Sequence, residues 1–186
     1  ISSDPAAFPF AERRIDAYDG ACRELFVIRN PSWYKKNGPE FDAARAEFFR
    51  TTQIPDVWVY YPQEKTLVHT VDEDAYFELR TARNRNLISK EEQERYRGAV
   101  VGIVGLSIGS IILSALVRTG GPKIIKLADF DTIELTNLNR MDADLLAYGE
   151  RKISIAARHV WAVDPFADLK LWDDGVTAET IESFIL

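Results

Sequence analysis

Apolar residues in the first half of the chain recur with two different periods. From Phe10 to Ile28 they fall three to four positions apart, which predicts a single helix. Asp56–Tyr61 and Lys65–Val71 are rich in valine, tyrosine, tryptophan and threonine and flank a short turn, which predicts an antiparallel strand pair. Further helices are expected over residues 39–51, 72–83 and 89–98. The last of these begins with Ser89 and Glu92 at the spacing of a capping box.

The second half of the chain alternates apolar strands with helical segments. Ala99–Val104 is typical of a buried strand, Ile108–Arg118 of a helix and Lys123–Ala128 of a second strand. This order predicts a parallel pair joined by a right-handed crossover. The remaining elements expected are a helix over residues 152–163, a strand over residues 169–172 and a final helix capped by Thr177. The pattern therefore predicts an α/β domain over residues 98–186, preceded by a small α+β segment over residues 1–97.

Composition and charge narrow the classes of function. The 186 residues include 23 basic and 29 acidic side chains, a net charge of −6, which argues against nucleic-acid and anionic-membrane partners. The longest apolar stretch, residues 99–117, is interrupted by glycine and serine and is shorter than the ~20 residues of a bilayer span. The single Cys22 excludes a disulfide framework and predicts a reducing, cytoplasmic setting. The chain begins at Ile1 rather than methionine, so we expect a piece of a longer protein.

A glycine-rich turn, Gly105-Leu106-Ser107-Ile108-Gly109-Ser110, lies between the first strand and the helix of the α/β part. Backbone N–H groups at such a turn can approach phosphate oxygens, and the helix N-terminus favours negative charge. Alternatively, the glycines serve only close packing of strand and helix. The same residues match G-x-S-x-G, a hydrolase nucleophile pattern with Ser107 as nucleophile. Only His159 follows as a base, inside a predicted helix, which disfavours the hydrolase.

An acidic residue at the tip of the second strand supports nucleotide binding. Asp129 follows the apolar strand at the distance where a carboxylate holds ribose hydroxyls in dinucleotide-binding folds. NAD and ATP both satisfy the glycine turn and this carboxylate. An NAD(P)-linked oxidoreductase is therefore one alternative at this point.

The segment after the second strand separates these alternatives. Residues 129–140, Asp-Phe-Asp-Thr-Ile-Glu-Leu-Thr-Asn-Leu-Asn-Arg, resemble the D-x-D-x-[VI]-x-x-[ST]-N-L-x-R signature of the ThiF/MoeB branch of the ubiquitin-activating-enzyme superfamily. Gly149-Glu150-Arg151-Lys152 resembles the G-x-x-K of the same family. The resemblance covers about residues 80–186 and extends to bacterial proteins that fuse such a domain to a nitroreductase-like domain. It implies a Rossmann-like doubly wound parallel sheet, of which this chain holds the N-terminal part.

The resemblance implies an ATP-dependent adenylyltransferase that uses Mg²⁺ and activates a carboxylate as an acyl-adenylate. The carboxylate would be the C-terminus of a small ubiquitin-like or sulfur-carrier protein, or another carboxylate substrate. Asp129 would hold the ribose, and Asn137 and Arg140 would orient and neutralise the phosphates. Lys152 would add a compact positive charge beside them. Such residues suit the reaction because negative charge gathers on the phosphates in the transition state.

Further residues follow from the same resemblance. Gly105, Ser107 and Gly109 would form the nucleotide cradle. Asp131 would orient the loop or a magnesium-bound water, or would close its turn through its own backbone. An arginine upstream of the glycine turn reaches the partner subunit's nucleotide site in this family, and Arg83 and Arg85 are the candidates. A homodimer is therefore expected, although a solvated charged helix explains these arginines equally well.

The sequence departs from the family pattern in two places. Ser107 stands where the family turn, G-x-G-x-x-G, has its second glycine, and the turn is one residue shorter. The family also places a further aspartate, which handles Mg²⁺, on a strand beyond residues 169–172, so the nucleotide-binding domain is expected to be truncated at its C-terminus. A non-catalytic nucleotide-binding or dimerisation module is the alternative function. We expect no metal-ligand set within the chain itself.

Overall fold

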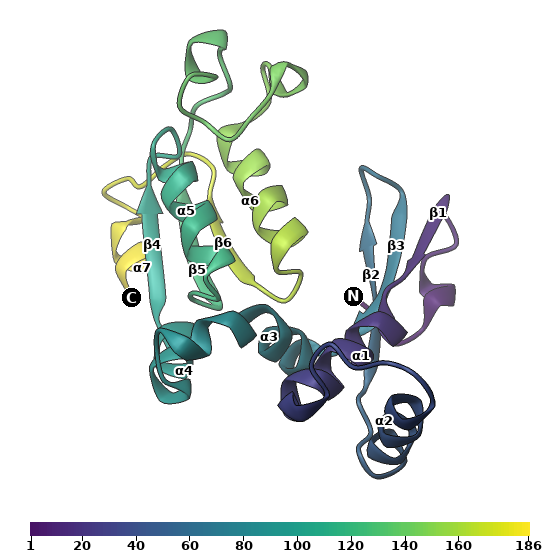
Figure 1. Cartoon of the computed structure of the whole chain (residues 1–186). Coiled ribbons are helices and arrows are strands. Elements are labelled where there is room, and N and C mark those ends of the chain that lie inside the picture. Colours follow the sequence, from purple (N-terminus) through teal and green to yellow (C-terminus); the bar gives the residue numbers. More distant parts are fainter. The chain divides into compact units, whose positions relative to one another are not determined.

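The computed structural model describes all 186 residues, which form two compact units, Ile1–Arg83 and Asn84–Leu186. The first unit holds a three-stranded sheet and three α-helices (Figure 1). Its elements are the 3-10 helices Pro5–Ala7 and Pro31–Trp33, strands β1 Arg13–Asp16, β2 Asp56–Tyr61 and β3 Thr66–Val71, and helices α1 Tyr18–Arg29, α2 Pro39–Thr51 and α3 Glu73–Thr81. The predicted antiparallel pair is confirmed as β2 and β3.

The single helix predicted over residues 10–28 is wrong in its first part. Arg13–Asp16 forms β1, which pairs in parallel with β3 so that the strand order is β1-β3-β2. The Asp16 carboxylate accepts a hydrogen bond of 3.1 Å from the backbone N–H of Tyr18, and α1 begins there. Pairing with a strand some 50 residues away overrides the local helical period, because the backbone groups of β1 find partners only across that distance.

The core of the first unit lies between α1, α3 and β3. Cys22, Leu25, Val71 and Ala75 are buried together there. The side chain of Phe26 meets Phe41 of α2 edge to face, with ring centroids 5.3 Å apart. These contacts hold α1 against β3 and α2 against α1.

The second unit is an α/β layer whose three strands are all parallel, in the order β4-β5-β6. Its elements are α4 Lys90–Gly98, β4 Val100–Val104, α5 Gly109–Arg118, β5 Ile124–Ala128, the 3-10 helices Leu135–Asn137 and Leu145–Ala147, α6 Lys152–Val163, β6 Asp168–Trp172 and α7 Ile181–Ile185. A 3-10 helix, Ala82–Asn86, joins the two units. The predicted α/β fold with a parallel sheet is confirmed.

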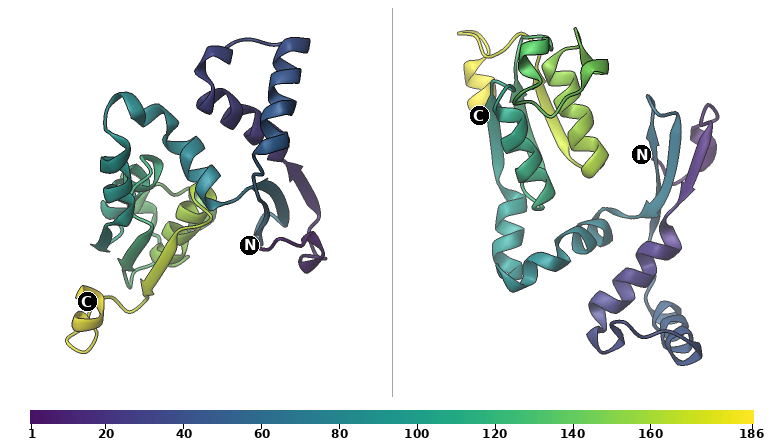
Figure 2. Two further views of the ribbon diagram at one scale, coloured as in Figure 1. Left: turned by 90° about the horizontal axis from the view of Figure 1, so that it is seen from below. Right: turned by 45° about the horizontal axis from the view of Figure 1, so that its top comes forward.

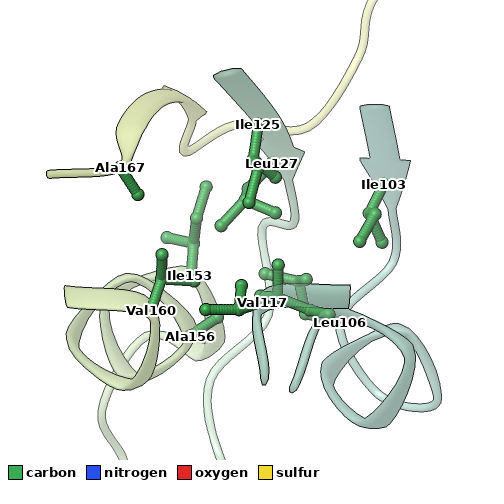
Figure 3. Packing of buried hydrophobic residues seen from close by; sticks show 10 residues of the cluster. Ile103, Leu106, Val117, Ile125, Leu127, Ile153, Ala156, Val160 and Ala167 are labelled. Atoms are coloured by element: carbon green, nitrogen blue, oxygen red, sulfur yellow. The ribbon is translucent and has the colours of Figure 1, made fainter. Parts of the chain in front are cut away.

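Helices α5 and α6 pack against one face of this sheet. Ile103 of β4 and Ile125 and Leu127 of β5 form a buried cluster with residues of both helices. Figure 3 shows the side chains of Ile125 and Leu127 pointing from β5 toward the helices, where Val160 of α6 is one of the residues that they face. Because side chains alternate along a strand, the neighbouring positions face the other side of the sheet.

The C-terminal helix packs against that other side. Lys126 Nζ donates a 2.9 Å hydrogen bond to the carbonyl oxygen of Phe184, and a Cβ on Gly102 would lie 2.8 Å from the Phe184 ring. Figure 2 shows the loop that leads from β6 to this helix, α7. The helix begins at Ile181 with Thr180 as its N-cap residue, so the cap predicted at Thr177 lies three residues too early. The Thr177 hydroxyl instead accepts the Glu179 N–H at 3.3 Å in the turn before the helix.

The helices of the structure are short relative to a lipid bilayer. None combines the length and the apolar character needed to cross a membrane.

Candidate functional site

The glycine turn connects β4 to α5 and leaves backbone donors without partners. Gly105 has φ of +84°, a conformation that glycine adopts without strain, and its N–H donates to the Ala128 carbonyl at 2.9 Å. No atom lies within 4 Å of the place where its Cβ would be, so the turn is open above this residue. The N–H groups of Ser107 and Ile108 have no acceptor within the protein. The turn therefore presents free N–H donors at the start of α5.

Gly109, the second glycine of the turn, has a packing role. A Cβ there would lie 2.8 Å from Ile103 Cγ2, so only glycine lets the helix approach β4 this closely. Close strand-helix packing, one of the three explanations open from the sequence, fits this position, and a role for Gly109 in nucleotide binding stays a prediction.

Asp129 fastens the glycine turn to the end of β5. Asp129 is buried, with only 7% of its surface exposed. One carboxylate oxygen accepts from the Leu106 N–H at 2.5 Å and the other from the Asp131 N–H at 2.8 Å. A carboxylate that receives two backbone donors holds both loops in one geometry.

Arg140 reaches the glycine turn from a distant part of the chain. It lies in the long loop between β5 and α6, yet its Nε donates to Ser107 Oγ at 2.8 Å. Its Nη1 donates to the Thr136 carbonyl oxygen at 2.8 Å and to Asn139 Oδ1 at 2.9 Å. Nη2 donates to no group of the protein. The structure thus brings together two of the residues that the sequence analysis selected, with two guanidinium N–H groups left free.

Lys152 is the first residue of α6 and forms an ion pair with Asp131. Its Nζ lies 2.7 Å from Asp131 Oδ2, and its backbone N–H donates to the Asp131 carbonyl oxygen at 3.0 Å. The lysine side chain is 6% exposed and the aspartate side chain 51%. The ammonium group is therefore held by a carboxylate that itself faces solvent.

Asn137 shapes the turn that carries Arg140. It is buried, and its Oδ1 accepts from the Glu134 N–H at 3.1 Å. Its carbonyl oxygen accepts from the Arg140 N–H at 3.0 Å. In this structure the asparagine side chain stabilises the turn, and its predicted contact with phosphates stays a prediction.

The loop between β5 and α6 has a small core of its own, which sequence reasoning missed. Ile133, Met141, Ala147 and Ile155 are buried together. The sequence signal for this core is the set of apolar residues that recur between the polar positions of the motif. This cluster anchors the loop on α6 and so supports the position of Arg140. Thr136 and Asn139, the other partners of Arg140, were also missed.

The structure does not bring the upstream arginines to the glycine turn. Arg83 is the last residue of the first unit, and Arg85 lies in the second. Between them, Asn84 Nδ2 donates to the Thr119 carbonyl oxygen at 2.9 Å, just past the C-terminal end of α5. The turn lies at the opposite end of that ten-residue helix. A role for Arg83 or Arg85 in a partner's site stays a prediction.

The hydrolase alternative receives no support from the geometry. His159 is exposed on α6, with Nδ1 3.4 Å from Asp142 Oδ2, and the Ser107 hydroxyl pairs with Arg140 instead. No three His, Cys, Asp or Glu side chains converge as a metal-ligand set.

Comparison with known proteins points to one family. The ThiF family model matches residues 81–186. An uncharacterized protein of Mycobacterium tuberculosis is 38% identical over 128 residues, which are 69% of this chain and 18% of that protein. Ubiquitin-like modifier-activating enzyme 5 of Aedes aegypti is 33% identical over 122 residues, 65% of this chain and 30% of the enzyme. The chain therefore spans less than a third of either relative.

A solved structure with the same fold is the E. coli tRNA N6-threonylcarbamoyladenosine dehydratase, TcdA. It has a TM-score of 0.54 and 26% identity, over 58% of this chain and 45% of that one. The same values hold for its complex with ATP.

Proposed function

Because the chain belongs to the ThiF family, we propose that it forms the nucleotide-binding part of an ATP-dependent adenylyltransferase. The contact between Arg140 and Ser107 is the observation that carries this proposal. It places a guanidinium with free N–H groups beside a glycine turn whose backbone donors are also free. TcdA, of similar sequence and fold, has been solved with ATP and with AMP, which supports nucleotide binding by this chain.

The donors at the turn match the charge of a triphosphate. The N–H groups of Ser107 and Ile108 bind phosphate oxygens at the positive end of α5. Arg140 offers Nη2 to the same oxygens, and the planar guanidinium carries a delocalised positive charge with its donors in a fixed arrangement. Asp129, at the tip of β5, keeps lone pairs beyond its two backbone bonds and takes the ribose hydroxyls.

ATP supplies an adenylyl group that joins the carboxylate substrate while pyrophosphate leaves. Negative charge grows on the departing phosphates during this step, and fixed cations lower its energy most when they need no rearrangement. Arg140 is held by three hydrogen bonds and Lys152 by its ion pair with Asp131, so both charges are in place before substrate arrives.

Mg²⁺ fits this site as an ion held mainly by the phosphate oxygens. The protein does not assemble a cage of three acidic side chains. Mg²⁺ commonly binds one or two carboxylates together with phosphates and water. Asp131 is the available carboxylate, because it is half exposed and only its Oδ2 is engaged by Lys152.

We infer that the carboxylate is the C-terminus of a ubiquitin-like or sulfur-carrier protein, or another carboxylate substrate. The similarity to ubiquitin-like modifier-activating enzyme 5 supports a protein carboxylate. A homodimer in which Arg83 or Arg85 serves the partner's nucleotide is part of the same proposal, as is a cytoplasmic setting.

Calorimetric titration with Mg-ATP tests the nucleotide site. The chain is expected to bind ATP, and Arg140→Ala to weaken binding roughly tenfold to a hundredfold, the value of hydrogen bonds to a charged group. Arg118→Ala is the matched control, since Arg118 also donates to a serine hydroxyl, Ser114 Oγ at 3.3 Å, but near the far end of α5. NADH binding without competition by ATP, or an unchanged ATP affinity in Arg140→Ala, contradicts the proposal.

A further inference from the structure

The serine in the glycine turn has a specific partner. Ser107 is half-buried, and its Oγ accepts the Nε–H of Arg140 at 2.8 Å. A glycine at this position has no side chain to make that bond. The two residues are 33 positions apart in the chain, so this hydrogen bond ties the loop after β5 to the turn after β4.

The hydrogen bond determines which way the guanidinium points. Arg140 has five N–H donors in one rigid plane. Nε is engaged by Ser107, and Nη1 by the Thr136 carbonyl oxygen and Asn139 Oδ1. These bonds occupy three of the five in-plane donors. Only the two N–H groups of Nη2 remain, and their direction follows from the three bonds already made.

The serine hydroxyl also keeps its own proton. Because Ser107 Oγ acts as acceptor toward Arg140, its O–H is free to donate. The hydroxyl hydrogen and the Ser107 and Ile108 N–H groups all belong to one short turn. The oxygen lone pair that accepts from Arg140 is the part of the hydroxyl that orients the neighbouring cation.

We propose that Ser107 is a positioning residue that directs Arg140 Nη2 toward the phosphates of the nucleotide. This inference rests on the proposed ATP site and assigns the serine a role within it. Ser107 acts through Arg140, so its removal weakens the contribution of the phosphates to binding and leaves the contribution of the nucleoside unchanged. The serine that stands in place of the second glycine of the family pattern therefore adds a hydrogen bond to Arg140.

A double-mutant cycle on nucleotide binding tests this role. Affinities for Mg-ATP and for adenosine are measured by calorimetry with the wild-type chain, Ser107→Ala, Arg140→Ala and the double variant. Ser107→Ala is expected to weaken ATP binding by roughly five- to tenfold, and by less than about twofold when Arg140 is already alanine. Adenosine affinity is expected to change by less than about twofold throughout.

Two comparison variants separate positioning from damage to the turn. Ser107→Thr keeps the hydroxyl and is expected to restore ATP affinity to within about twofold of wild type. Ser114→Ala removes the analogous hydroxyl that bonds Arg118, and ATP affinity is expected to stay unchanged. Additive effects of Ser107→Ala and Arg140→Ala, or an equal loss of ATP and adenosine binding, overturn the inference.

A second measurement needs no nucleotide. In nitrogen–proton NMR spectra the Arg140 Nε–H is expected to exchange slowly with water and to lose this protection in Ser107→Ala. If the Arg140 Nε–H is protected but the chain binds no ATP, the hydrogen bond to Ser107 is confirmed and the proposed function is contradicted. An Nε–H that exchanges rapidly in the wild-type chain overturns the inference directly, whatever the ATP affinity.

Discussion

Replacing Asp129 by alanine is expected to destabilise the second unit strongly, apart from any effect on nucleotide binding. The change removes the acceptor for two backbone N–H groups, those of Leu106 and Asp131, at a residue that is 7% exposed. A buried donor left without an acceptor costs about 1–3 kcal/mol. Part of this cost is offset, because the alanine variant no longer buries a charged carboxylate. We therefore expect a net loss of about 2–4 kcal/mol for Asp129→Ala.

Asp144→Ala provides the matched control for this prediction. Asp144 also accepts a backbone N–H, that of Leu146 at 2.9 Å, but it is exposed at the start of a 3-10 helix. Loss of such an exposed cap costs about 0.5–1 kcal/mol. Asp129→Asn keeps one acceptor oxygen and is expected to fall between the two alanine variants.

Hydrogen exchange measured by mass spectrometry provides the assay, without nucleotide. Peptides from β4 and β5 report the opening free energy of the second unit alone, so unfolding of the first unit does not interfere. If Asp129→Ala lowers that free energy no more than Asp144→Ala, the carboxylate does not fasten the glycine turn.

Gly109→Ala is expected to cost about 1–3 kcal/mol of unfolding free energy in denaturant titrations, because its Cβ would meet Ile103 Cγ2 at 2.8 Å. Burial raises the pKa of Tyr18 from 10.0 to about 12. Between pH 10.0 and about 12 only the unfolded chain loses the phenol proton, so the stability of the first unit is expected to fall as pH rises through this range. Tyr18→Phe should remove this fall, as followed by circular dichroism. Asp131→Ala leaves the buried Lys152 ammonium without its carboxylate and is expected to cost about 1–3 kcal/mol, whereas adding Lys152→Met should recover part of that loss in denaturant titrations.

Elements determined by local signals could be predicted closely. The helix expected over residues 152–163 matches α6, and the capping box at Ser89 and Glu92 is present at the start of α4. Both depend on side chains a few residues apart, which the sequence displays directly. β1 could not be predicted in this way, because its pairing with β3 connects segments far apart in the chain.

In the candidate site, too, the local motif could be predicted and the long-range contact could not. The motif identified Arg140 and Lys152, and the structure gives each a defined set of partners. The bond from Arg140 to Ser107 has no local signal, since it depends on how the loop after β5 folds back over the turn. The loop folds in this way because Ile133 and Met141 are buried with α6. Long-range packing of this kind leaves only scattered apolar positions in the sequence.

Exchange of labelled pyrophosphate into ATP, measured on the protein at its full natural length, tests the proposed activity most directly. Label is expected to enter ATP only when an acceptable carboxylate is present, and Arg140→Ala is expected to slow this exchange roughly tenfold or more. Arg118→Ala should leave it unchanged. ATP binding without exchange across a panel of ubiquitin-like, sulfur-carrier and small-molecule carboxylates would contradict the adenylyltransferase and favour a nucleotide-binding module.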